Sequence, residues 1–285
     1  MDLLRSTLQP LTHNLPPPLR NLGLSLLGPT CYQTLILDLD PTSLPCVRLA
    51  LSKGLGISII ATSSIVKIPQ ILKLLTSQSA AGISFLSYLL ETSSLLISLA
   101  YNVRQGFPFS TYGELALIAV QNVVIAVLVL RFAGRGAAAG AFVAGLAAAG
   151  YALFDTGLVD AALLNYLQAG AGALGVASKM PQIWTVWQQG GTGQLSAFAV
   201  FNYLMGSLSR IFTTLQETGD KLIFYSYLAS FLLNAVLAAQ MVYYWNSPQS
   251  ANHAAELGKE PKKIAMGSST GNAAKAKSPT TRRRG

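Results

Sequence analysis

Long apolar runs separated by short polar stretches dominate the sequence from about residue 49 onward. Seven of these runs approach the length of about 20 residues that a helix needs to cross a bilayer. They predict helices at 49–75, 83–103, 111–132, 137–154, 160–187, 195–215 and 221–245. The first and fifth are overlong, so their last turns should extend past the membrane core. We therefore predict an all-α membrane protein with seven transmembrane helices.

One short phrase occurs twice within these runs, 112 residues apart. The residues from Lys67 to Ile71 read KIPQI and those from Lys179 to Ile183 read KMPQI, and Ser84 has its counterpart in Ser196. An internal duplication accounts for this, with three helices in each copy and the helix at 137–154 as a linker. Because an odd linker helix restores the orientation, the two repeats should be parallel in a 3+1+3 arrangement.

A proline interrupts the first helix of each copy. Pro69 removes a backbone donor and frees the carbonyl of Ile65, and Pro181 does the same to Ala177. In a bilayer these groups must be satisfied by neighbouring protein or trapped water. The matched pair therefore predicts bent helices around a polar cavity, with Pro69 and Pro181 as hinges. The alternative is a packing kink without a role in transport.

Composition divides the chain further. We expect a lumenal or interfacial segment at 1–48, the core of the first repeat at 49–103, its third helix and loop at 104–136, the linker at 137–154, the second repeat at 155–246 and a disordered basic tail at 247–285. The tail carries most of the net charge of +9, which favours anionic lipid headgroups over nucleic acid because no folded domain accompanies it. Cys31 and Cys46 are compatible with either a disulfide or two free thiols.

The basic residues next to the spans predict an orientation. Lys73, Arg131, Arg135 and the basic tail fall on one face of a seven-helix arrangement. Cytosolic loops of membrane proteins carry an excess of Lys and Arg. The C-terminus is therefore predicted to be cytosolic and the N-terminal segment lumenal.

Few ionisable groups lie within the predicted spans, so each is a candidate site. Glu91 lies about 12 Å along the second helix, too deep to reach the interface, so it needs a partner or a hydrated cavity; a neutral Glu91 that joins two helices is the alternative. Lys67, Lys179 and Arg210 are long enough to snorkel, and the two lysines are equally suited to an anionic headgroup. The candidate substrate- or headgroup-binding residues are Lys67, Gln70, Glu91, Lys179, Gln182 and Arg210.

Other polar residues have structural interpretations. Ser84, Ser196, Asp160 and Asp220 stand at predicted helix starts and are expected to be N-caps. The small residues of the linker helix are expected to pack tightly against those of the fifth helix, Gly170, Ala171, Gly172 and Gly175; the alternative is low-complexity Ala/Gly filler without a specific partner. The sequence has no nucleotide loop, metal cluster or nucleophile constellation. Its loops of about 6 to 9 residues leave no room for a soluble catalytic domain, so we expect neither an enzyme nor a metal or cofactor.

The two Pro-Gln phrases, each followed by a short loop and a serine at the next helix start, resemble the PQ-loop superfamily, which contains the SWEET sugar transporters and lysosomal amino-acid exporters. A closer similarity is to the mannose-P-dolichol utilization defect protein family. The segments that carry it are Cys31–Tyr32, Leu44–Cys46, Leu51–Gly56, Gly106–Ser110, Gly193–Ser196, Ser209–Thr213 and Gln216–Asp220. The Pro-rich start, the Ala/Gly linker helix and the basic tail depart from the family pattern.

This resemblance implies a multi-pass protein of the endoplasmic-reticulum membrane that is required for lumenal use of dolichol-phosphate mannose and dolichol-phosphate glucose. Its implied partners are these lipid-linked monosaccharides, membrane lipids and lumenal glycosyltransferases, with no nucleic acid. Glu217 and Asp220 would lie in a lumenal loop.

The sequence leaves three classes of molecular function open. The protein would carry or flip the lipid, present it as a non-transporting chaperone or scaffold, or export a small soluble sugar or amino acid. Proton-linked exporters use acids within the membrane. Because Glu91 is the one acid predicted to lie within the membrane, the third class is disfavoured.

Overall fold

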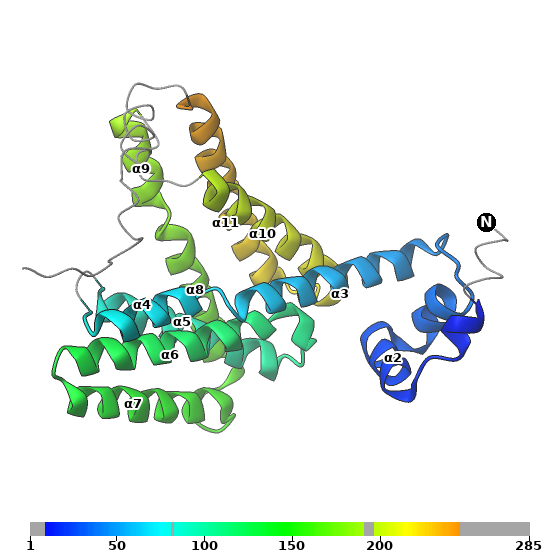
Figure 1. The fold of residues 1–285 in the computed structure, drawn as a ribbon, viewed down its shortest axis with the longest axis horizontal. Helices are drawn as coiled ribbons and strands as arrows, with labels where there is room; N and C mark the ends of the chain where they lie inside the picture. Colours follow the sequence, from blue (N-terminus) through cyan, green and yellow to red (C-terminus); the bar gives the residue numbers. More distant parts are fainter. Residues whose placement is uncertain (1–8, 81–82, 191–196, 246–285) are drawn as a thin grey trace, which may run out of the picture.

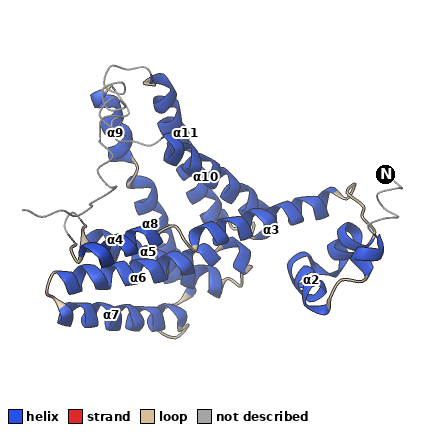
Figure 2. Ribbon diagram, in the orientation of Figure 1, coloured by secondary structure: helices blue, strands red, loops and turns tan. Residues whose placement is uncertain are grey.

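The computed structural model describes residues 9–80, 83–190 and 197–245, and the elements in this part of the chain are helices (Figure 1). No strand occurs among the described residues (Figure 2). The elements are α2 (Pro17–Tyr32), η1 (Gln33–Leu37), α3 (Leu44–Ser63), α4 (Ile68–Ser77), α5 (Phe85–Arg104), η2 (Phe109–Thr111), α6 (Gly113–Phe132), α7 (Gly136–Phe154), α8 (Ala161–Ala177), α9 (Met180–Gln189), α10 (Ala197–Glu217) and α11 (Lys221–Tyr243).

The helices form two half-bundles, α3 to α6 and α8 to α11. The halves meet where α10 packs on α3 and α8 packs on α5. From this junction they diverge, so that α4 and α9 lie far apart (Figure 1). Each half thus has one end joined to its partner and one end that stands away from it.

Four segments within the described residues are long and apolar enough to cross a membrane: Leu44–Ser77, Gly113–Phe132, Gly136–Phe154 and Lys221–Tyr243. α5 and α10 have a similar length but carry many hydroxyl side chains. Such polar helices are typical of membrane proteins whose interior, rather than lipid, faces the hydroxyl groups.

The linker helix does not pack as predicted. α7 lies mainly against α5 and α6, where Phe142 packs on Phe85 and the Ala126–Leu130 region of α6. Of the small residues of α8, Gly172 instead faces α11. A Cβ on Gly172 would lie 2.6 Å from the Ser226 hydroxyl oxygen, so the glycine is needed for this close approach. The expectation that the linker packs tightly on the fifth helix is therefore wrong.

Both helices that contain the Pro-Gln phrase are interrupted rather than merely bent. α3 ends at Ser63 and α4 begins at Ile68, while α8 ends at Ala177 and α9 begins at Met180. Pro69 and Pro181 lie in the first turns of α4 and α9, where a helix needs no amide donor. The Ile65 carbonyl accepts a hydrogen bond from the Ile68 amide at 3.1 Å, so the turn itself satisfies it. Their role as hinges stays a prediction.

A glutamine on α6 stabilises the first interruption. The Gln121 side chain donates to the Ser63 carbonyl at 2.8 Å and accepts from the Lys67 amide at 2.9 Å. The amide group thus bridges the donor and the acceptor of the one backbone bond, from the Lys67 amide to the Ser63 carbonyl, that a continuous helix would have made. The duplicated position in the second half is Leu233, so the second interruption lacks this support.

Replacing Gln121 with leucine is expected to destabilise the protein, because the Ser63 carbonyl and the Lys67 amide would both lose a buried partner. The free energy of unfolding should fall by about 1–3 kcal/mol. Thermal unfolding of the purified protein in detergent would measure the change. Val120→Leu, at an exposed neighbouring position, is the control and should unfold like the unmodified chain. Equal unfolding of both variants would mean that the interruption is stable without Gln121.

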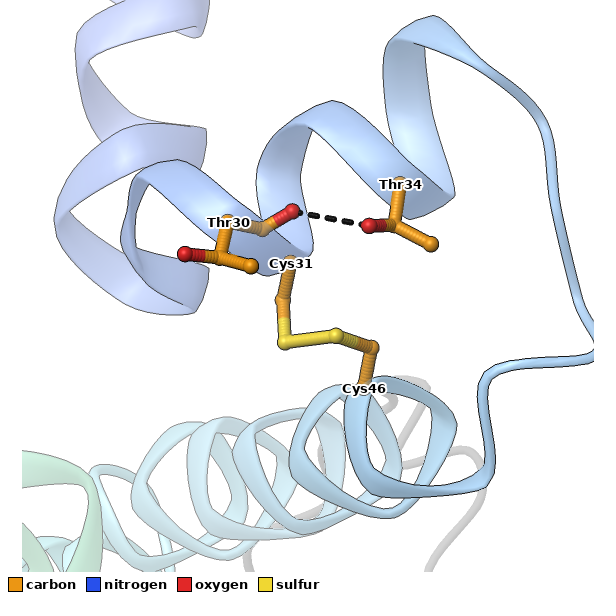
Figure 3. Close-up of a disulfide and its surroundings, with 4 residues drawn as sticks. All are labelled: Thr30, Cys31, Thr34 and Cys46. Carbon is orange, nitrogen blue, oxygen red and sulfur yellow. Dashed lines mark hydrogen bonds between the residues drawn. A yellow bond between two sulfur atoms is a disulfide. The ribbon is translucent and has the colours of Figure 1, made fainter.

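The N-terminal part is attached to the bundle by a disulfide. Cys31 in α2 and Cys46 in α3 are joined, with 5.1 Å between their Cα atoms (Figure 3). Beside it, the Thr34 hydroxyl donates to the Thr30 carbonyl at 2.9 Å. Of the two alternatives left by the sequence, the structure thus contains the bonded form. α3 also begins at Leu44, earlier than predicted, because Pro45 is compatible with a first helical turn.

Three of the predicted N-caps are confirmed. The side chains of Ser84, Asp160 and Asp220 accept hydrogen bonds from the amides of Ser87, Leu163 and Ile223. The fourth, Ser196, and the predicted basic tail at 247–285 lie outside the described residues.

Candidate functional site at the junction of the two halves

Charged side chains connect the two halves only at the joined end, as far as the described residues show. We define the joined end by Lys53 on α3, Glu114 on α6, Arg210 and Glu217 on α10, and Asp220 at the start of α11. Each of these residues contacts the opposite half.

Glu217 is the most fully coordinated of these groups. Its carboxylate accepts hydrogen bonds from the Lys53 ammonium at 2.6 Å, from the Ser52 hydroxyl at 2.5 Å and from the Ser110 hydroxyl at 2.7 Å. The side chain is 1% exposed. The approach of α3 depends on Gly56, since a Cβ there would lie 2.4 Å from the Ser110 carbonyl oxygen. Glu217 thus fastens the last turn of α10 to α3 and η2.

Arg210 forms a second buried connection. Its guanidinium is paired with the Glu114 carboxylate, and it also donates to the Ser110 carbonyl at 3.3 Å. Arg210 and Glu114 are 4% and 6% exposed. The structure therefore does not show the snorkelling arrangement considered for Arg210, because a carboxylate is available within the bundle.

A third connection involves Asp220. The Tyr101 hydroxyl on α5 donates to one carboxylate oxygen at 2.9 Å, while the other oxygen caps α11 through the Ile223 amide at 2.8 Å. One aspartate thus both starts a helix and joins it to the other half. The structure brings Arg210, Glu217 and Asp220 together from the predicted candidates.

At the diverging end, the polar contacts between described residues stay within each half. In the first repeat, the Lys67 ammonium contacts both oxygens of Glu91 at 2.7 and 3.0 Å and lies 5.1 Å from the centre of the Tyr88 ring. Gln70 lies within hydrogen-bonding reach of Tyr88. Lys67, Gln70 and Glu91 therefore form one group. Glu91 has the partner that its depth required, although its side chain is 45% exposed.

The second repeat has a different arrangement. The Lys179 ammonium donates to Ser230 at 2.9 Å and to Asn234 at 2.7 Å, and the Asn234 amide donates to Ser207 at 3.1 Å. Gln182 is exposed and lies outside this group. The duplicate of Asn234 in the first repeat is Asn122, which is fully buried and has no hydrogen-bond partner among the described residues for either amide atom.

A cavity of about 290 Å³ lies between the halves, bounded by α5, α6, α8 and α11, with both apolar and polar side chains in its lining; we call it the polar cavity after the latter. Its polar lining consists of Ser94, Ser98, Asn102, Gln168, Ser226, Tyr227 and Ser230. Tyr227 is an electrostatic neighbour of Arg210 and Glu114, which places the cavity next to the joined end. Hydroxyl and amide groups of this kind are suited to ligands with several hydroxyl groups.

Several functional residues were missed at the sequence level. Glu114 was not considered, and Glu217 was assigned to a loop, yet both acids are buried in the bundle. The interpretation of Glu91 as the only acid within the spans is therefore wrong, and it no longer argues against a proton-linked exporter. The presence of Arg210 in an apolar helix was the available signal, because a buried guanidinium requires a carboxylate nearby.

The comparisons with known proteins agree with this architecture. The PQ loop repeat pattern matches residues 51–111 and 163–223, which have the same spacing of 112 residues as the two Pro-Gln phrases. The human protein solute carrier family 66 member 3 is 28% identical over 190 residues, covering 66% of this chain and 91% of that protein.

The fold is also that of a solved structure. A eukaryotic SWEET transporter determined at 3.7 Å resolution matches with a TM-score of 0.59 and 14% identity, covering 72% of this chain and all of the solved chain. The predicted fold class, an all-α membrane protein with two PQ-loop repeats, is confirmed.

Proposed function

Since the chain carries two PQ-loop repeats in a SWEET-like fold, we propose that it is a membrane carrier that works by alternating access, with a lipid-linked monosaccharide of the dolichol-phosphate class as its substrate. One observation carries the proposal. Among the residues that the structure describes, the buried ionic contacts between the halves are confined to the joined end, and the polar cavity lies beside them. A carrier that is closed on one side of its site and open on the other requires this distribution.

The substrate class rests on the resemblance to the mannose-P-dolichol utilization defect family. Four of the segments that carry this resemblance meet at the joined end, through Ser52 and Lys53, Ser110, Arg210, and Glu217 with Asp220. Segments far apart in the sequence are thus similar to one family and lie in one place. In the predicted topology this end is lumenal, and the protein is located in the endoplasmic-reticulum membrane.

Reconstitution of the protein into vesicles would test whether it moves the lipid across the bilayer. Vesicles containing isotopically labelled dolichol-phosphate mannose would be treated with membrane-impermeant periodate, which oxidises only exposed mannose. Without protein, the outer-leaflet pool alone should react, whereas proteoliposomes should expose the whole pool. Binding of the lipid without this exposure would instead support a protein that presents it. Failure with the lipid, together with passage of a free sugar or amino acid, would support the soluble-solute exporter.

Cells lacking the protein are expected to synthesise dolichol-phosphate mannose but use it poorly, because the headgroup would not reach the transferases. Analysis of oligosaccharide-lipids should then show truncated species, and expression of the intact chain should restore the full-length ones. Normal glycan precursors in such cells would contradict the proposed substrate.

A further inference from the structure

The two duplicated lysines differ in how their charges are balanced. Lys67 is paired with Glu91, whereas Lys179 donates to the neutral side chains of Ser230 and Asn234. In the described part of the chain, no carboxylate lies within 4.0 Å of the Lys179 ammonium. The cause is visible in the sequence, because the duplicate of Glu91 is Tyr203. The second repeat therefore holds a cation without a counterion.

The neutral partners of Lys179 are held in place by their own contacts. Asn234 is 2% exposed and donates its amide hydrogens to the Tyr203 carbonyl at 2.9 Å and to the Ser207 hydroxyl at 3.1 Å. Its amide oxygen is thereby directed to Lys179. The ammonium has a fixed position, and an incoming anion would not have to displace an acidic side chain to reach it.

Lys179 lies at the interruption between α8 and α9, next to two spaces of opposite character. Gly175 and Val176, in the last turn of α8, line the polar cavity described above, to which the Lys179 partner Ser230 also contributes. On the other side, an apolar groove of about 700 Å³ runs along α9 and α11. Its lining is Ala177, Met180, Ile183, Trp184, Trp187 and Gln240.

We propose that Lys179 binds the phosphate of the substrate, with the sugar in the polar cavity and the first isoprenoid units in the groove along α9. The order of environments, from hydroxyls and amides through a single cation to an aromatic and aliphatic surface, matches the order of sugar, phosphodiester and hydrocarbon chain. Charge-assisted hydrogen bonds to phosphate are among the strongest that a lysine makes. This assignment rests on the proposed function and adds to it the residue that binds the phosphate.

The cavity contains a further acceptor suited to a sugar. The Gln168 side-chain oxygen is buried and lacks a hydrogen-bond partner among the described residues. A buried acceptor without a donor is costly unless a ligand supplies one. A sugar hydroxyl next to the Lys179-bound phosphate would do so.

Binding to the full-length protein in detergent would test the assignment with three probes: mannosyl phosphate carrying a short isoprenoid chain, neutral octyl mannoside, and mannose 1-phosphate. Lys179→Gln should weaken binding of the prenyl mannosyl phosphate by about tenfold to a hundredfold, the range for hydrogen bonds to charged groups. Binding of octyl mannoside should be unchanged. Lys179→Arg should retain most of the affinity, and Lys73→Gln on the exposed face of α4 is the matched control.

A second variant tests the charge without removing the lysine. Tyr203→Glu introduces an acid at the position duplicated from Glu91 and should weaken binding of the prenyl mannosyl phosphate. Tyr203→Gln should leave that binding unchanged. Equal losses for the charged and neutral probes in Lys179→Gln would overturn the assignment and show a structural role. Unchanged binding of all probes would also overturn it, while leaving the carrier function intact.

Mannose 1-phosphate, the remaining probe, shows whether the site prefers a lipid-linked sugar phosphate or a free one. Tight binding of the prenyl mannosyl phosphate with weak binding of mannose 1-phosphate is expected, because the groove contributes only when a hydrocarbon chain is present. Equal affinities would overturn the part of the proposal that concerns the groove. If the unmodified protein binds none of the three, both the assignment and the proposed substrate class fail.

Discussion

Replacing Arg210 with methionine is expected to lower the free energy of unfolding by about 3–5 kcal/mol, because the Glu114 carboxylate would remain buried without its counterion. The two side chains are almost inaccessible and come from opposite halves. The loss should therefore appear both as a lower thermal midpoint and as weaker association of the half-bundles. Thermal unfolding in detergent and protease sensitivity of the folded protein would measure these effects.

The double variant Arg210→Met with Glu114→Leu separates charge from packing. Buried ion pairs can often be replaced by apolar residues of similar volume with little loss of stability. We therefore expect the double variant to regain most of the stability but not the transport activity, since alternating access requires contacts that separate. A double variant as unstable as Arg210→Met alone would show that the unpaired carboxylate is not the cause.

Glu217→Gln is expected to shift the protein towards a conformation in which the joined end is open. The substitution removes the ion pair with Lys53 and leaves that ammonium buried, which costs about 2 kcal/mol. A change of this size alters the ratio of two conformations roughly 30-fold. Transport of labelled lipid should consequently become uncoupled or slow.

Labelling of a single thiol would measure the shift. The chain contains two cysteines, and both are in the disulfide, so Thr111→Cys introduces the only free thiol. Thr111 is buried beside Ser110 at the joined end. A membrane-impermeant maleimide should label it slowly in the otherwise unmodified chain and faster with Glu217→Gln. Gln105→Cys, at an exposed position in the loop after α5, is the control for general reactivity. Equal rates at Thr111→Cys with and without Glu217→Gln would show that the pair holds the fold rather than a gate.

The elements and the duplication could be predicted because they depend on local patterns. Apolar runs indicate spans, Ser84, Asp160 and Asp220 indicate helix starts, and a repeated phrase indicates two related halves. The interruptions at Lys67 and Lys179 were only partly foreseen. A proline indicates where a helix can be disturbed, but the support from Gln121 depends on a helix far along the chain.

The candidate site was less predictable because it depends on pairs. Arg210 was recognised as unusual, yet its partner Glu114 stands 96 positions earlier in the sequence and was not considered. Lys53 is not among the candidate residues that the sequence indicates, although it neutralises Glu217. Charge in an apolar sequence shows that a partner is required, whereas only the packing of α3, α6 and α10 shows which residue fulfils that requirement.

The redox state of Cys31 and Cys46 should show in which orientation each molecule was inserted into the membrane. Disulfides form and persist in oxidising compartments such as the endoplasmic-reticulum lumen, and rarely in the cytosol. Cys46 lies in the first turn of α3, at the end of that helix that follows the predicted lumenal segment. A chain inserted the other way round should therefore keep two reduced thiols, and their titration under denaturing conditions would count inverted molecules in a mixed population.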